Sequence, residues 1–137
     1  MIKALLDTNI LIDYMVPDRP HSNVAAVIID AAGEGRFEAV VSASSLKDIY
    51  YITRKSLADD IVRDYIAAFL DLMEVAPVDR AACADALRSD EPDFEDGIVR
   101  AIAESSGADF IVTRDGKAFG KSGVRAMTSA LFAEVIA

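Results

Sequence analysis

The stretch Ile2-Lys3-Ala4-Leu5-Leu6-Asp7-Thr8-Asn9 places a short apolar run directly before an acidic residue. An apolar run of this length is typical of a buried strand. In open sheets of parallel strands, ligand sites lie beyond the carboxyl ends of the strands. We therefore expect a buried strand over residues 2–6 and a candidate site residue at Asp7.

The rest of the sequence alternates short apolar runs with helical patterns. Strands are expected over residues 39–41, 74–76, 110–113 and 124–127, and helices over 23–32, 45–54, 59–72, 79–87, 95–105 and 129–136. A further helix is expected to start near Ile10, with Asp7 as its possible cap. Alternating strands and helices predict right-handed βαβ units, and hence an α/β fold with helices on both faces of a largely parallel sheet.

Length and composition narrow the class of protein. The chain has 137 residues, enough for one domain spanning 1–137, and its formal net charge is −9. That charge argues against a simple basic nucleic-acid binder, but not against a nuclease, because bound metal ions invert the charge of an acidic site. A single cysteine, Cys83, excludes an intrachain disulfide. We expect a cytoplasmic protein without a membrane span or signal peptide.

Acidic residues follow or adjoin the predicted strands, at Asp7, Asp48, Asp96 and Asp115. Asp93, three residues before Asp96, is expected to cap the same helix. Two carboxylates 4 Å apart repel by about 4 kcal/mol at an effective dielectric constant of 20, so such a cluster calls for a cation. Oxygen ligands suit Mg²⁺ or Mn²⁺. With one histidine and no cysteine cluster, a zinc site is not expected.

Taken together, four stretches of the chain resemble the PIN domain family, a metal-dependent ribonuclease fold whose bacterial members include the VapC-type toxins of toxin–antitoxin pairs. These stretches are Leu5-Leu6-Asp7-Thr8-Asn9-Ile10-Leu11-Ile12-Asp13, Val40-Val41-Ser42-Ala43-Ser44-Ser45-Leu46-Lys47-Asp48, Asp93-Phe94-Glu95-Asp96-Gly97-Ile98 and Ile111-Val112-Thr113-Arg114-Asp115. The resemblance implies a three-layer α/β/α fold with a parallel sheet of about five strands in the order 3-2-1-4-5.

The resemblance also implies roles for individual residues. The catalytic acids would be Asp7, Asp48, Asp96 and Asp115, and the metal ligands among them Asp7, Asp96 and Asp115. The supporting polar residues would be Thr8, Asn9 and Thr113. The chain departs from the family pattern in two places. Asp48 stands where Glu is usual, and the last motif has its acid at Asp115, whereas the family often has Asn there and its acid at the position of Ala118.

The activity implied is that of a Mg²⁺- or Mn²⁺-dependent endoribonuclease acting on single-stranded RNA or a structured RNA loop. A small cognate antitoxin is the implied protein partner, and a homodimer is expected. Arg114 and Lys117 belong to a short basic stretch beside Asp115 and are candidates for contacts with RNA phosphates.

Two other hypotheses stay open at this stage. One is a phosphoacceptor signalling module on a flavodoxin-like fold, which would need paired acids after the first strand, where this chain has Asp7 followed by Thr8 and Asn9. The other is a PIN fold without catalysis that acts only as a binding module, which the departures at Asp48 and Ala118 keep open.

Overall fold

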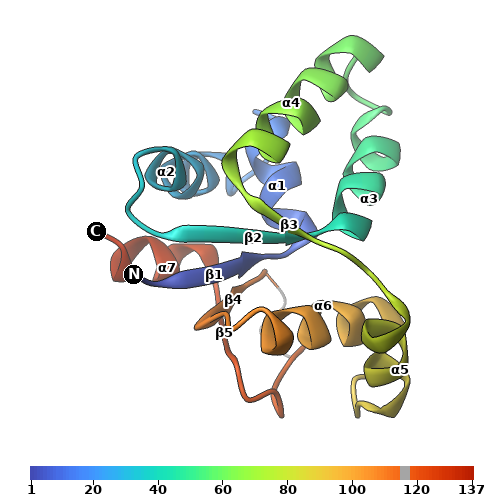
Figure 1. The fold of residues 1–137 in the computed structure, drawn as a ribbon. Coiled ribbons are helices and arrows are strands. Elements are labelled where there is room, and N and C mark those ends of the chain that lie inside the picture. The colour runs from blue at the N-terminus through green and yellow to red at the C-terminus, as the bar shows by residue number, and fades with distance from the viewer. Residues whose placement is uncertain (115–117) are drawn as a thin grey trace.

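The computed structural model describes residues 1–114 and 118–137 (Figure 1). Its strands are β1 (Lys3–Leu6), β2 (Glu38–Ser42), β3 (Glu74–Ala76), β4 (Phe110–Val112) and β5 (Arg125–Met127). Its helices are α1 (Thr8–Met15), α2 (Ser22–Gly33), α3 (Ala43–Thr53), α4 (Asp59–Leu72), α5 (Arg80–Arg88), α6 (Phe94–Ser105) and α7 (Ser129–Val135). The strands form one parallel sheet in the order β3-β2-β1-β4-β5, which confirms the predicted order.

The apolar core is divided between the two faces of the sheet, because side chains alternate from one face to the other along the central strands. Successive side chains of a strand point to opposite faces. Leu6 and Val112 accordingly pack in one apolar cluster, which includes residues of α1, α2, α4 and α7. Leu5 and Ile111 pack in a second cluster, with residues of α5 and α6. The result is the predicted three-layer fold, in which α5 and α6 cover one face of the sheet (Figure 1).

The predicted boundaries hold to within about two residues, and the shift at the start of α1 bears on the site. Helix α1 begins at Thr8, not near Ile10 as predicted. Asp7 ends the buried strand and also caps this helix, because its carboxylate accepts a hydrogen bond from the Thr8 amide at 2.8 Å. An N-cap aspartate stabilises a helix start by satisfying an otherwise unpaired amide. Asp7 is therefore the one residue that separates β1 from α1.

Helices α5 and α6 pack unusually closely at Gly97. A Cβ atom added to Gly97 would lie 3.0 Å from Ala86 Cβ and 3.1 Å from Ala86 Cα. The absence of a side chain at this position lets α5 approach α6, which carries Asp96 in its first turn.

In the part of the chain that is described, we found no helix both long and apolar enough to cross a membrane.

Candidate active site

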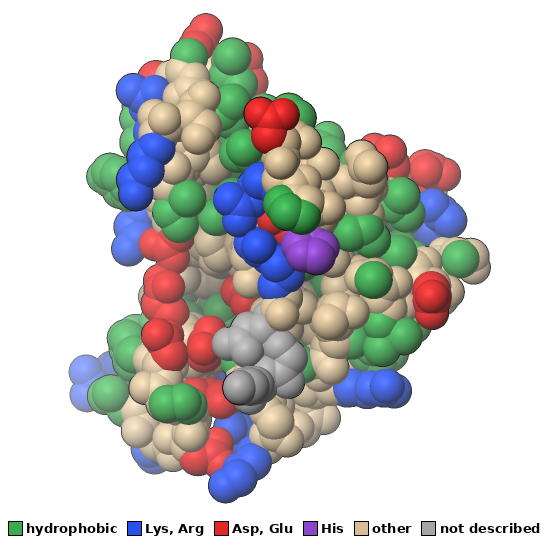
Figure 2. Space-filling view, turned by 180° about the vertical axis from the view of Figure 1, so that it is seen from behind, with side chains coloured by type: hydrophobic (Ala, Val, Ile, Leu, Met, Phe, Trp, Pro, Cys, Tyr) green, Lys and Arg blue, Asp and Glu red, His purple; other side chains and the backbone are tan. Residues whose placement is uncertain are grey.

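A hollow of about 240 Å³ at the carboxyl end of β1 brings together three of the four predicted acids. Asp7 comes from the end of β1, Asp48 from α3 and Asp96 from α6; Thr8 and Asn9 of α1 line the hollow as well. Figure 2 shows Asp and Glu side chains gathered where this face of the molecule is hollowed. The fourth predicted acid, Asp115, and the predicted RNA contact Lys117 lie outside the described residues.

The carboxylate of Asp7 is held on both of its oxygens. Oδ1 accepts from the Thr8 amide at 2.8 Å, and Oδ2 accepts from the Thr113 hydroxyl at 2.9 Å. The second contact exists because β1 and β4 are neighbours: the Asp7 amide donates to the Val112 carbonyl at 3.0 Å, which brings Thr113 beside Asp7. A carboxylate fixed in this way loses little conformational entropy when it binds a ligand.

A second polar contact links α1 to α3 across the hollow. The Thr8 hydroxyl donates to Ser45 Oγ at 2.8 Å. Ser45 is buried, and Asp48 follows it by three residues, so the two side chains share one face of α3. The half-buried Asp48 side chain thereby faces the hollow, and its Oδ1 lies 3.5 Å from Nζ of Lys47 at the exposed rim.

The N-terminus of α6 presents two acids to the hollow. Asp93 is the N-cap residue, and its Oδ1 accepts from the Asp96 amide at 3.1 Å, as the sequence predicts. Asp96 then lies in the first turn, where the positive end of the helix dipole favours a negative charge. Glu95, from the same turn, also lines the hollow.

Glu95 and Asp48 form a close pair of carboxyl groups. A hydrogen bond with Asp48 raises the pKa of Glu95 to about 7, and burial and the negative charges of Asp48 and Asp93 act in the same direction. Lys47 opposes this shift. The negative charge of the hollow is therefore high enough for Glu95 to keep its proton near neutral pH. The same negative charge favours the binding of a cation.

The donor atoms of the hollow fit a hard divalent cation. Within residues 1–114 and 118–137 we found no group of three or more Asp, Glu, His or Cys side chains arranged to hold a metal ion. Mg²⁺, however, is usually bound by one or two carboxylates together with waters and substrate phosphates. Asp7 and Asp96, both in the hollow, supply oxygen donors of that kind.

Sequence reasoning did not assign three polar residues that line the hollow, Ser44, Ser45 and Glu95. For Ser45, a signal was present, since a residue three positions before Asp48 shares its helix face. For Glu95 the sequence provides no signal, because its contact is with Asp48 on a different helix. Arg114 lies at the end of β4, where its amide donates to Asn9 Oδ1 at 3.4 Å.

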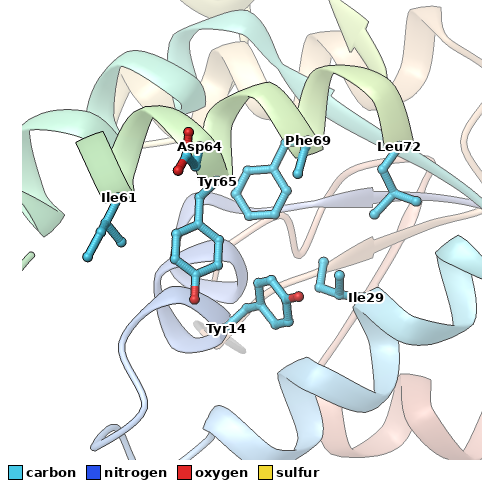
Figure 3. Close-up of a pocket in the computed structure, with 8 residues that line it drawn as sticks. Tyr14, Ile29, Ile61, Asp64, Tyr65, Phe69 and Leu72 are labelled. Atoms are coloured by element: carbon cyan, nitrogen blue, oxygen red, sulfur yellow. The ribbon is translucent and has the colours of Figure 1, made fainter. Parts of the chain in front are cut away.

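A second hollow, of about 320 Å³, lies between α1, α2 and α4 (Figure 3). It is lined from α1, α2 and α4 by Tyr14, Ile29, Ile61, Asp64, Tyr65, Ala68, Phe69 and Leu72. The rings of Tyr14 and Tyr65 meet edge to face, with 5.8 Å between their centroids. Burial raises the pKa of Tyr14, as do the charges of Tyr65 and Asp30. We call this hollow the apolar groove.

The fold and the acidic hollow together define an α/β protein with a polar site at the carboxyl edge of a parallel sheet, next to its first strand. The chain belongs to the PIN domain family, whose model matches residues 3–117. A search of curated proteins by sequence found no match.

Solved structures share the fold along most of the chain. VapC20 from Mycobacterium tuberculosis, described as a sarcin–ricin loop cleaving toxin, superposes with a TM-score of 0.71 at 16 % identity, covering 88 % of this chain and 95 % of that one. A toxin–antitoxin complex from Klebsiella pneumoniae gives 0.69 at 20 % identity, covering 92 % and 97 %. DNA-bound VapBC from Salmonella typhimurium gives 0.66 at 21 % identity, covering 94 % and 99 %. The fold is thus that of toxins from toxin–antitoxin systems.

Proposed function

We propose that this PIN domain is a metal-dependent endoribonuclease and the toxin of a toxin–antitoxin pair. The observation that carries the proposal is the single hollow lined by Asp7, Asp48 and Asp96, which come from three separate elements of the fold. The likeness to a toxin described as cleaving the sarcin–ricin loop supports RNA as the substrate class. The whole chain would act as one domain in the cytoplasm.

Asp7, Asp96 and the sequence-predicted Asp115 would hold Mg²⁺ or Mn²⁺, with Asp48 beside them. Such an ion supplies activation of the attacking water and stabilisation of the leaving oxygen of the phosphodiester. Thr113 and the Thr8 amide orient the Asp7 carboxylate, since each donates to one of its oxygens. Glu95 shares a proton with Asp48, which lowers the repulsion between acids when no cation is bound.

The test is cleavage of labelled single-stranded and hairpin RNAs in Mn²⁺, Mg²⁺ or EDTA. We expect cleavage that requires the metal and falls by at least about 100-fold in Asp7→Asn, which removes the charge but keeps a side chain able to cap α1. Asp71→Asn, on the exposed end of α4, is the matched control and should cut at the wild-type rate. Full activity of Asp7→Asn would refute the assignment. A folded protein that binds no metal and cuts no RNA would instead be a binding module.

We further propose that a small antitoxin covers the apolar groove. The groove leaves apolar surface open between α1, α2 and α4, and Ile61 at its edge is 45 % exposed. A partner that covers the groove would remove this apolar surface from water, which favours binding. Several structures that share this fold are toxin–antitoxin complexes, which supports an antitoxin as the occupant. The chain itself would form a homodimer through another face.

A further inference from the structure

A buried carboxylate on α1 holds two arginines from distant parts of the chain. Asp13 is fully buried, and its Oδ1 accepts from Nε of Arg19 at 2.8 Å. The same oxygen lies 3.3 Å from Nη2 of Arg114, at the end of β4. Because both nitrogens meet at one oxygen, the two guanidinium groups lie side by side.

The charges in this cluster do not cancel. Two guanidinium groups face one carboxylate, so the cluster carries an excess positive charge on a chain whose formal net charge is −9. One arginine would suffice to compensate a buried carboxylate, and placing a second beside it costs repulsion between like charges. Each arginine side chain is 33 % exposed, so both are open to solvent while being held in place.

The cluster borders the acidic hollow. Asn9 lines the hollow, and Asp13 follows it by one turn of α1, a rise of about 6 Å along the helix axis. On the other side, Arg114 directly follows Thr113, whose hydroxyl donates to Asp7. Figure 2 shows Lys and Arg side chains gathered on the same face as the acidic hollow. If one phosphate of an RNA strand lies in the hollow, a neighbouring phosphate of the same strand would lie beside the two arginines.

We propose that Arg19 and Arg114 form a clamp for an RNA backbone phosphate next to the one being cleaved, with Asp13 as its positioning residue. This inference rests on the proposed ribonuclease function and adds Arg19 and Asp13 to it. A guanidinium group presents a planar fork of N–H donors that matches the oxygens of a phosphate. The hydrogen bond from Arg19 and the ion pair of Arg114 with Asp13 orient both forks before RNA binds, which reduces the entropy lost on binding.

The first test measures RNA binding apart from cleavage. Fluorescein-labelled uridine homopolymer is titrated with metal-free protein in EDTA, over a series of KCl concentrations. We expect Arg19→Gln to weaken binding about tenfold and to reduce the slope of log K against log salt by about 0.7, the value for one phosphate contact on a single strand. Arg80→Gln, the same charge change on the exposed first residue of α5, should leave the slope unchanged.

The second test separates orientation from charge. Asp13→Asn keeps both arginines and adds one net positive charge to the chain. If Asp13 positions the clamp, this variant binds RNA more weakly than wild type despite its added charge. Tighter binding by a variant that melts at the wild-type temperature would overturn the positioning role. Arg19→Lys, which keeps the charge without the fork, should retain the salt slope and regain part of the affinity that Arg19→Gln loses.

The outcomes separate the clamp from the nuclease. A folded Arg19→Gln protein with wild-type affinity and salt slope overturns the clamp, and so does a wild-type chain that binds no RNA. Binding that depends on Arg19, in a protein that cuts no RNA with either metal, keeps the clamp and overturns the nuclease proposal.

Discussion

Helix α1 contributes to two hollows of similar size and opposite chemistry. Its first turns line the acidic hollow with Thr8, Asn9 and Ile12, and its last turn places Tyr14 in the apolar groove. The acidic hollow contains carboxylates that repel one another until a proton or a cation binds. The apolar groove leaves hydrocarbon surface open to water until another surface covers it. The two hollows thus favour different ligands, and variants should affect them independently.

The largest expected difference is in catalysis. Asp96→Asn in the acidic hollow should lower the rate of metal-dependent RNA cleavage by at least about 100-fold, because it removes a proposed metal ligand. Ile61→Ser in the apolar groove should change that rate by less than about twofold, since its side chain lies on α4 away from the acids. Initial rates in saturating Mn²⁺ measure both. A comparable loss in Ile61→Ser would show that the two hollows are coupled.

Partner binding should show the opposite pattern. Ile61→Ser should weaken the affinity for a co-encoded antitoxin about tenfold, because burying an isoleucine side chain contributes about 1.5–3 kcal/mol. Asp96→Asn should bind that partner with unchanged affinity. Titration calorimetry with the purified partner provides the comparison. If both variants bind equally well, the antitoxin docks on another surface.

A smaller effect concerns the packing that holds Asp96 in the acidic hollow. Gly97→Ala should lower the free energy of unfolding by about 1–3 kcal/mol, because the new methyl group would press on the backbone of Ala86. The better helix propensity of alanine offsets only part of this loss. In Gly123→Ala, the new methyl group meets nothing within 4 Å, so this control should be neutral or slightly stabilising. Urea unfolding monitored by circular dichroism distinguishes the two.

The smallest effect is on pH dependence. The pKa of Glu95 is raised from 4.5 to about 7 in the folded chain, so between these values the folded state binds more protons than the unfolded state. Its contribution to stability is therefore present below pH 4.5 and is lost as the pH rises through 7. Metal-free wild type should lose more stability over this range than Glu95→Gln does. Parallel unfolding curves for the two proteins would contradict the Asp48–Glu95 pair.

Much of the fold followed from the order of residues along the chain. The apolar run before Asp7 predicted β1, and the alternation of strands and helices predicted the layered α/β architecture that the structure confirms. Asp93 was recognisable as the cap of α6 from its spacing to Asp96. These features depend on hydrogen bonds and side-chain periods that act over a few neighbouring residues, which is why they are visible in the sequence.

The candidate site divides in the same way. The sequence named Asp7, Asp48 and Asp96, and the structure places them in one hollow, whereas the roles of these residues and of Asp115 stay predictions. Only the tertiary structure brings Glu95 against Asp48, Ser45 against Thr8, and Arg114 against Asp13. Each of these contacts joins segments far apart in the chain. Such pairs depend on how the helices pack on the sheet. The type of a side chain and its neighbours in the sequence do not determine which distant residue it will contact.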